Sequence, residues 1–231
     1  PNYLHDAHIR FALRADANAI CEKPLVLNPW NVDALKSLEA ETGRKINTIL
    51  QLRLHPSIIA LKNRIDSAGK TKKYDIVLTY ITPRGKWYHY SWKGDKMKSG
   101  GIATNIGIHF FDMLAWIFGK TKGSILHYSS DDKASGLLEL ENANVKWFLS
   151  LYKNDLQAGE KTFRSITING EEIEFSEGFT DLHTISYKEI LEGKGFSVDE
   201  AKSSVETVYE IRNSVPIGLK GEYHPFLKNI K

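Results

Sequence analysis

The segment ANAICEKPLVLNPWNVDALKSLEAETGRKINTILQL, residues 17–52, decides the fold of the first part of the chain. It predicts an apolar strand over 17–22, a helix over 29–42 that opens with Asn-Pro and closes at a glycine, and a second apolar strand over 46–52. A further helix is predicted over about 4–15. Alternating helices and continuously apolar strands are typical of a parallel sheet covered on both faces, so we predict part of a doubly wound α/β domain.

The pattern changes after another helix, which follows Pro56. Apolar runs separated by turn residues predict strands at 74–81, 86–91, 124–130, 135–141, 144–151, 162–169 and 172–176. Asn169-Gly170 is the strongest hairpin signal, because this pair adopts the positive φ of a type I′ turn. Helices are expected at about 101–118, 181–192 and 198–213. The second part is therefore predicted to be an α+β domain, an open antiparallel sheet with helices on one face.

The composition favours a small-molecule partner. Of the 231 residues, 42% are hydrophobic and 26% charged, and 31 Lys plus Arg stand against 28 Asp plus Glu. The net charge of +3 is too small to indicate nucleic-acid binding. The single cysteine, Cys21, suits a reducing compartment and excludes an internal disulfide. No apolar run approaches the roughly 18 residues of a membrane span and no signal peptide is evident, so we expect a cytoplasmic protein without a membrane partner.

Polar residues follow each of the two predicted parallel strands, at the edge where open α/β sheets bind ligands. After the first strand come Glu22, Lys23 and Pro24. A lysine near a nicotinamide cation and a sugar hydroxyl would have a lowered pKa, in the range useful for proton transfer. After the second strand come Gln51 and Arg53, of which the arginine could bind an anion or pair with a local carboxylate. The structural alternative for the Glu-Lys pair is a solvated strand end.

A second candidate site is SGGIATNIGIHFFD, residues 99–112. Asn105, His109 and Asp112 are four and three residues apart, so they can lie on one face of a helix. His109 could accept a proton from a substrate hydroxyl, because an unperturbed imidazole has a pKa near about 6.5. The alternative is a core histidine satisfied by Asp112.

A third candidate is KWYHYSWKGDKMK, residues 86–98, which interleaves aromatic residues with lysines. This pattern could stack on a base or sugar and neutralise phosphate or carboxylate, and single-stranded nucleic acid would fit it too. An amphipathic strand is the structural alternative, and the small net charge disfavours nucleic acid. His5 and His8 lack a third ligand nearby, so no metal site is predicted. The absence of HExxH, CxxC and GxSxG motifs gives a nucleophilic hydrolase little support.

Taken together, PNYLH (1–5), EKP (22–24), QxRxxP (51–56) and SGG followed by NxxxHxxD (99–112) resemble the Gfo/Idh/MocA family of nicotinamide-dependent sugar oxidoreductases. The resemblance spans nearly the whole chain, including SYKEILEGKGFSVDEAKSSVETVYEIRNS near its end. ICEKPLVLNPWNVDAL, NTILQLRLHP and GGIATNIGIHFFD are most similar to the WlbA/WbpB type, the UDP-N-acetyl-2-amino-2-deoxyglucuronate (UDP-GlcNAcA) dehydrogenases of bacterial surface-polysaccharide and O-antigen synthesis.

This resemblance implies that residues 1–52 are the C-terminal part of a Rossmann domain and residues 53–231 a substrate-binding and oligomerisation domain. It implies oxidation of the C3 hydroxyl of a UDP-GlcNAcA-type nucleotide sugar, hydride transfer to NAD, and a homo-oligomer (dimer or tetramer) formed through the open sheet. Lys23 and His109 match the catalytic residues. The expected cofactor-binding residues are Asn2, His5, Glu22, Lys23, Pro24, Gln51 and Arg53. The expected substrate-binding residues are Lys23, Arg53, Trp87, Tyr88, Trp92, Lys93, Thr104, Asn105, His109 and Arg164, with Lys86 and Lys96 as further candidates for the diphosphate.

The chain departs from the family pattern at two points. Many members have an aspartate where this chain has Asn105, and an amide cannot share a proton, so proton acceptance is expected to rest on His109 or Lys23. Asn105 then becomes a hydrogen-bonding substrate ligand. No GxGxxG motif precedes the EKP segment, although a Rossmann domain needs that turn for the pyrophosphate. We therefore expect a fragment that lacks the N-terminal part of this domain and binds NAD poorly alone, and the choice between NAD and NADP would rest on that part.

Two other functions remain open for the same fold. One is a dehydrogenase of a free sugar or inositol. The other is a non-catalytic sugar-binding or regulatory protein. Lys23 and His109 disfavour the second, because binding alone requires no residues for hydride transfer.

Overall fold

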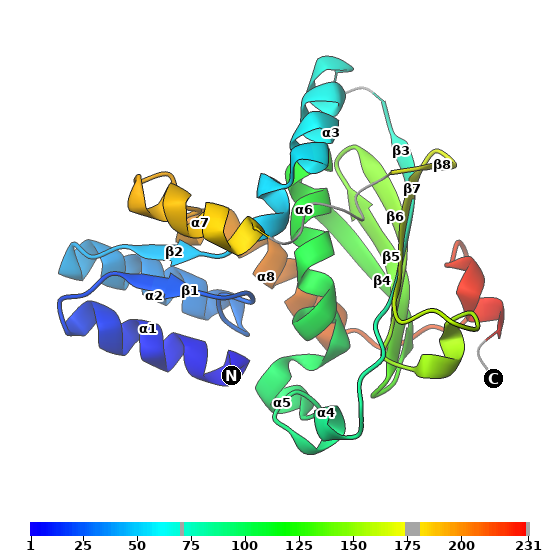
Figure 1. The fold of residues 1–231 in the computed structure, drawn as a ribbon, viewed down its shortest axis with the longest axis horizontal. Helices are drawn as coiled ribbons and strands as arrows, with labels where there is room; N and C mark the ends of the chain where they lie inside the picture. Colours follow the sequence, from blue (N-terminus) through cyan, green and yellow to red (C-terminus); the bar gives the residue numbers. More distant parts are fainter. Residues whose placement is uncertain (70–71, 174–180, 230–231) are drawn as a thin grey trace.

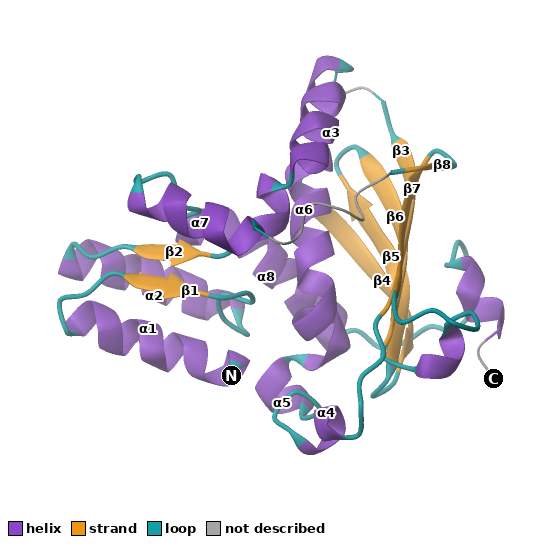
Figure 2. Cartoon of the chain, viewed as in Figure 1, coloured by secondary structure: helices purple, strands orange, loops and turns teal. Residues whose placement is uncertain are grey.

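The computed structural model describes residues 1–69, 72–173 and 181–229. A small unit of two strands with helices packed on them contains the N-terminus, and a larger sheet lies beside it (Figures 1 and 2). Long helices run between the two, so that the chain forms one continuous arrangement of helices around two sheets.

The N-terminal unit confirms the predicted alternation of helix and strand. β1 (Ala19–Cys21) pairs in parallel with β2 (Ile46–Thr48). Packed around them are η1 (Asn2–Leu4), α1 (His5–Arg14) and α2 (Pro29–Thr42). Their apolar side chains share a core with the first half of a late helix, α8 (Val198–Asn213). One helix from the end of the chain thus contributes to the N-terminal core.

The second strand is shorter than predicted. Only Ile46–Thr48 of the predicted range 46–52 is strand, and residues Gln51–Leu54 form a 3₁₀ turn, η2. Thr48 makes an isolated bridge to Phe196, after which the backbone turns away toward α3 (Pro56–Ser67). The polar residues that follow the strand therefore lie on a turn.

The larger sheet has six strands in the order β4-β5-β6-β3-β7-β8. Their bounds are β3 (Tyr74–Ile81), β4 (Thr121–Ser129), β5 (Lys133–Leu140), β6 (Ala143–Ser150), β7 (Phe163–Ile168) and β8 (Glu171–Glu172). The β4–β5–β6 meander is antiparallel, and the β7–β8 hairpin has positive φ at Asn169 (52°) and Gly170 (86°), as predicted. Residues 174–176 of the last predicted strand lie outside the described residues.

One pairing in this sheet differs from a simple meander. β3 lies between β6 and β7, antiparallel to β7 but parallel to β6. The first strand in sequence is therefore central in the sheet. The open, mainly antiparallel sheet with helices on one face confirms the predicted fold class.

The helices of this part gather on one face of the sheet. α3, α6 (Ile108–Phe118) and the second half of α8 lie on this face, and α7 (Leu182–Leu191) lies nearer the N-terminal unit (Figure 1). The predicted helix at 101–118 is confirmed, but η3 (Ala103–Gly107) within it is a π-helical turn. The chain also contains the short helix η4 (Lys153–Asp155).

The predicted strand at 86–91 is wrong. Trp87–Tyr90 form a short helix, α4, and Lys96–Ser99 form another, α5. Of the aromatic side chains in α4, only Tyr88 is buried, so the burial does not alternate as it does in a strand. Among the residues that the structure describes, none of the strands pairs with this segment, and the preference of aromatic residues for sheets is overridden by its surroundings.

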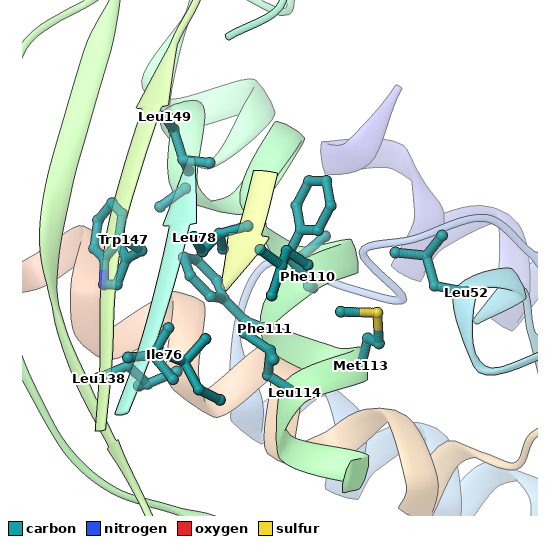
Figure 3. Packing of buried hydrophobic residues seen from close by; sticks show 14 of the residues in the cluster. Leu52, Ile76, Leu78, Phe110, Phe111, Met113, Leu114, Leu138, Trp147 and Leu149 are labelled. Atoms are coloured by element: carbon teal, nitrogen blue, oxygen red, sulfur yellow. The ribbon is translucent and has the colours of Figure 1, made fainter. Parts of the chain in front are cut away.

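Apolar side chains of α6 fill the space between helices and sheet. Figure 3 shows Phe111 and Leu114 of α6 close to Ile76, Leu78 and Trp147 of the sheet. The Phe111 and Trp147 rings meet edge to face at 5.2 Å. This packing fixes the position of α6, and with it the π-turn that precedes it.

One stretch, Lys96–Phe118, has the length and mean hydropathy of a membrane span, contrary to the expectation from the sequence. In the structure 72% of this apolar window is buried inside the protein. The stretch is therefore a core helix in this fold.

The C-terminal segment crosses the opposite face of the sheet and ends in η5 (Pro225–Asn229). His224 is buried, its Nε2 atom lies 2.9 Å from Thr79 Oγ1, and its ring stacks on Phe148 at 5.5 Å. Burial lowers the pKa of His224 to about 4. This face is thus partly covered by the chain's own end.

Candidate active site

Lys23 and Asn105 join the two parts of the chain. Lys23 follows β1 and is partly buried, and its Nζ atom donates a hydrogen bond of 2.8 Å to the backbone carbonyl of Asn105. Asn105 lies in the π-turn at the start of α6, and π-turns occur frequently at functional sites. Two predicted site residues, 82 positions apart, are therefore in direct contact.

The side chain of Asn105 is held by two further residues. Its Nδ2 atom donates to the Tyr88 hydroxyl at 2.8 Å, and its Oδ1 atom accepts a longer contact of 3.4 Å from Asn2 Nδ2. Asn2 also donates to the carbonyl of Ser99 at 2.8 Å. Asn2, Tyr88 and Asn105 are all buried, and they link the N-terminus, α4 and the π-turn.

His109 lies on α6, four residues after Asn105. Its pKa is well below 6.5 because burial disfavours the charged ring and because Lys23, His183 and Arg164 place positive charge nearby. Among the residues that the structure describes, none hydrogen-bonds to its imidazole. His109 is therefore neutral at physiological pH and can accept a proton from a bound group.

The electrostatic environment of Lys23 is also positive. Burial lowers its pKa to about 8, Glu22 opposes this shift, and Lys93 and Arg84 add to it. Arg84 donates to Thr82 Oγ1 at 2.7 Å, and the Lys93 ammonium lies over the Trp87 ring at 5.3 Å. Within the described part of the chain, neither Arg84 nor Lys93 forms an ion pair. The site thus gathers cations that an anionic ligand would neutralise.

The residues expected at the cofactor lie around the carboxyl ends of β1 and β2. His5 Nδ1 lies 2.8 Å from the Pro24 carbonyl, and burial lowers the pKa of His5. Glu22 Oε1 lies 3.1 Å from His183 Nε2 on α7. Gln51 is buried, and its Oε1 atom has no hydrogen-bond partner among the described residues. A buried amide oxygen without a partner fits a site for a further polar ligand such as the nicotinamide end of a dinucleotide.

The structure does not bring Arg53 to this site. Its guanidinium donates two hydrogen bonds of 2.8 Å to Asp112 and one of 3.1 Å to the Glu200 carbonyl, and it lies over the Phe196 ring at 5.2 Å. The Arg53 and Asp112 side chains are only 7% and 4% exposed. Arg53 therefore links η2, α6 and α8, and its guanidinium is used within the core and not at the site. Asp112 is paired with Arg53 and makes no hydrogen bond to His109 among the described contacts. The alternative interpretation of the sequence, a core histidine satisfied by Asp112, is therefore wrong.

The aromatic and cationic segment contributes some of its predicted residues. Tyr88 reaches Asn105, whereas Trp87 is 53% exposed at the edge of the site. The Lys93 ammonium also lies over Trp92 at 5.7 Å, so these three side chains form one group around Lys93. No described contact connects Lys86 to the site. Lys96 instead pairs with Asp131 at 3.2 Å, on the β4–β5 turn.

Two remaining predicted ligands lie at different depths. Thr104 is fully buried behind Gly100, where a Cβ would come within 2.6 Å of its methyl group, so it does not line an opening. Arg164 on β7 lies with its guanidinium 5.4 Å from the centre of the Tyr80 ring and contributes positive charge at His109.

Sequence reasoning missed Arg84 and left His183 undecided. Arg84 lies three residues after the end of β3 and directly after Pro83. A cation shortly after a predicted strand was the only sequence feature that could have indicated its role. The sequence indicated that His183 could cap a helix or reach the cleft, and its contact with Glu22 places it beside the end of β1. The position of His183 depends on a contact with a residue distant in sequence, and Arg84 acts through its charge on Lys23, which is also distant in sequence.

Comparisons with known proteins identify the family and the fold. Residues 62–229 match the family described as oxidoreductase family, C-terminal alpha/beta domain (Gfo/Idh/MocA). The WlbA (WbpB) dehydrogenase from Thermus thermophilus, in complex with NAD and α-ketoglutarate, superposes with a TM-score of 0.93 at 50% identity, over 98% of this chain and 74% of that chain. The same enzyme in complex with NAD and UDP-GlcNAcA gives a TM-score of 0.92 at 49% identity, with the same coverage.

A curated relative is more distant. A putative UDP-kanosamine synthase oxidoreductase subunit from Amycolatopsis mediterranei is 28% identical over 134 residues, which are 57% of this chain and 37% of that protein. The chain thus matches little more than a third of this relative's length. The family match covers well over half of the chain and extends from α3 to the C-terminal η5. The chain belongs to the Gfo/Idh/MocA family of oxidoreductases.

Proposed function

We propose that this chain provides the substrate domain and the nicotinamide side of the cofactor site of an NAD-dependent dehydrogenase. Its substrate would be UDP-GlcNAcA or a closely similar nucleotide sugar, oxidised at the C3 hydroxyl for surface-polysaccharide synthesis in the cytoplasm. The contact of Lys23 with Asn105, one turn before His109, is the observation that carries the proposal. It joins residues 1–52, as the end of a Rossmann domain, to residues 53–231, as the substrate domain. The similarity to the Thermus thermophilus complex with NAD and UDP-GlcNAcA supports the choice of ligands.

In this proposal His109 accepts the proton of the substrate hydroxyl. Its lowered pKa keeps the ring neutral, and its imidazole is free of hydrogen bonds within the described part of the chain. Lys23 orients the same hydroxyl from the side of β1, and its proximity lowers the basicity of His109 while its amine is charged. Loss of the Lys23 proton therefore makes His109 a stronger base.

NAD, when bound, would accept the hydride from the carbon that carries this hydroxyl, C3 of the sugar. Asn2, His5, Glu22, Pro24 and Gln51 would hold its nicotinamide end. The unpartnered Gln51 Oε1 atom supports this assignment. Arg84, Lys93 and Arg164 would neutralise the carboxylate and diphosphate of the substrate.

We also propose that the protein forms a homo-oligomer through the open sheet and its edge. Support comes from exposed apolar side chains where the C-terminal segment runs along β4: Ile125 (41%), Val215 (81%), Ile217 (41%) and Leu219 (55%). Ile217 N–H donates to the Leu126 carbonyl at 2.9 Å, so this segment extends the sheet edge. Analytical ultracentrifugation tests the proposal, and a monomer at micromolar concentration would overturn it.

The complete gene product, incubated with NAD and UDP-GlcNAcA, tests the proposed activity through the absorbance of NADH. We expect turnover with UDP-GlcNAcA to exceed turnover with UDP-GlcNAc, inositol or free glucose. Turnover of a free sugar or inositol alone would replace the proposed substrate, and no turnover with any of them would favour a binding protein.

His109→Ala tests the assigned base, with His8→Ala as the control because His8 is exposed on α1. Removal of a general base costs typically about 10²- to 10⁴-fold in rate. Activity of His109→Ala equal to that of His8→Ala would contradict the assignment of His109.

A further inference from the structure

Tyr88 is a buried residue whose hydroxyl is used for one short contact. The side chain is 3% exposed, and its Oη atom accepts the hydrogen bond of 2.8 Å from Asn105 Nδ2. Its ring lies 5.9 Å from that of Trp87, in an edge-to-face arrangement. The Asn105 amide has one other contact, the 3.4 Å approach of Asn2, which is beyond the usual range of an N–H···O bond. Tyr88 therefore provides the stronger restraint on the Asn105 side chain.

Asn105 makes its contacts in two directions. Its side chain meets Tyr88, while its backbone carbonyl accepts the bond from Lys23 Nζ. A π-turn has i→i+5 bonding and is wider than an α-helical turn, and such turns interrupt the regular ladder of backbone hydrogen bonds. Asn105 is the central residue of this turn, so its carbonyl orientation depends on how the turn is held.

The turn is also held by packing at Gly107. A Cβ at Gly107 would come within 2.7 Å of both Leu149 Cδ1 and Phe111 Cε2, so this glycine allows the turn to lie directly on the sheet. Tyr88 restrains the turn at Asn105. The turn is thus fixed between the apolar core and one tyrosine hydroxyl.

We propose that Tyr88 is a positioning residue, which fixes Asn105 and through its backbone carbonyl holds Lys23 in the site. This inference rests on the proposed dehydrogenase function, in which Lys23 orients the substrate hydroxyl. Tyr88 then holds Asn105 and Lys23 in place both before and after the substrate binds. A residue that only contacts the sugar would act in the bound state alone.

The physical consequence concerns the charged form of Lys23. A carbonyl that accepts a hydrogen bond from an ammonium stabilises that charged form, and it opposes the effect of burial. Without the Tyr88 hydroxyl, the Asn105 amide loses its short restraint and the carbonyl no longer has a fixed orientation. Lys23 then keeps its buried surroundings but loses its acceptor, and its pKa falls further below the normal lysine range.

Tyr88→Phe removes only the hydroxyl, and Tyr90→Phe is the matched control. Tyr90 lies on the same short helix, but it is 88% exposed. The ionisation of Lys23 is measured in the complete gene product from the pH dependence of its reaction with an amine-acylating reagent, with the modified peptide quantified by mass spectrometry. This measurement does not depend on turnover, so it distinguishes failure of the positioning role from failure of the proposed activity.

We expect the Lys23 pKa to fall by about half a unit or more in Tyr88→Phe, since one hydrogen bond is worth about a threefold to tenfold change in an equilibrium. At a pH well above the Lys23 pKa of about 8, where Lys23 is neutral in both proteins, kcat/KM should fall by a similar factor because Lys23 no longer holds its position toward the substrate hydroxyl. Tyr90→Phe should match the wild type in both measurements. An unchanged or raised Lys23 pKa in Tyr88→Phe would overturn the assignment.

A double-mutant cycle separates positioning from a general loss of structure. In Asn105→Ala the backbone carbonyl remains but the amide that Tyr88 restrains is absent. If Tyr88 acts through Asn105, Tyr88→Phe has no further effect on the Lys23 pKa in the Asn105→Ala background. Equal effects in both backgrounds would contradict the proposed route.

Discussion

Replacement of Arg53 by methionine tests whether this arginine stabilises the fold or binds the substrate. The guanidinium makes two hydrogen bonds of 2.8 Å to Asp112 and one of 3.1 Å to the Glu200 carbonyl. Methionine has a similar length and can keep the packing against Phe196, but it provides no donor. The variant therefore leaves the Asp112 carboxylate buried without its cation.

The expected loss is large because both side chains are almost inaccessible, at 7% and 4% exposed. Removing one partner of a buried ion pair destabilises a protein by about 3–5 kcal/mol. A typical domain has a total free energy of unfolding of about 5–15 kcal/mol, so Arg53→Met should lose a substantial fraction of it. Arg53→Met combined with Asp112→Asn should recover most of the loss, because no unpaired charge then remains in the core.

Urea unfolding of the complete gene product, followed by tryptophan fluorescence, measures these changes. Trp116 is a useful reporter because its ring lies 6.0 Å from the Arg53 guanidinium. In Arg53→Met the unpaired Asp112 carboxyl should have a folded-state pKa above its unfolded value. The native variant then binds a proton more tightly than the unfolded chain, and this contribution to stability is present at low pH and is lost as the pH rises through the folded pKa. The destabilisation should therefore be smaller at pH 5 than at pH 8.

Two results would refute this reasoning. One is a loss below about 1 kcal/mol in Arg53→Met, which is the size expected of an exposed ion pair. The other is a double variant as unstable as the single one. If the double variant folds but shows a KM for UDP-GlcNAcA raised by tenfold or more, Arg53 would also belong to the substrate site.

Three further predictions concern the site. The kcat/KM should rise with pH through an apparent pKa near 8, because Lys23 is neutral above this value and no longer lowers the basicity of His109. This rise should be absent from the pH profile of Lys23→Met. Arg84→Gln should raise the KM for UDP-GlcNAcA by about tenfold, the effect of losing one charge-assisted hydrogen bond, and an unchanged KM would remove Arg84 from the site. Gly107→Ala should lower the free energy of unfolding by about 1–3 kcal/mol in urea titrations, because the methyl group of the alanine would overlap Leu149. A variant as stable as the wild type would show that the π-turn can shift.

The sequence alone predicted the local elements well where one short-range signal dominates. The alternation of helix and apolar strand at the N-terminus, the Asn169-Gly170 hairpin and the helix at 101–118 were confirmed. Each depends on periodicity or on the φ preference of residues within one segment. The order of motifs also indicated that Lys23 and His109 belong to one site, although their spacing gave no geometry.

Residues 86–91 show the limit of local signals. Alternating aromatic side chains favour a strand, but a strand needs a neighbour for its backbone hydrogen bonds. No strand in the described ranges pairs with this segment, which forms a helical turn that buries Tyr88 while Tyr90 remains 88% exposed. The position of β3 between β6 and β7 was equally invisible, because strand order depends on pairing between distant segments.

The sequence by itself determined most of the element types, the family and the order of the site residues along the chain, since these follow from local patterns and short motifs. Only the tertiary structure decided their partners. It paired Arg53 with Asp112 across 59 residues, and it brought Lys23 to the Asn105 carbonyl across 82. It also fixed Asn105 by Tyr88. These contacts follow from the packing of α6 in the larger core and of α8 across both cores, and burial and charge at the site depend on that packing.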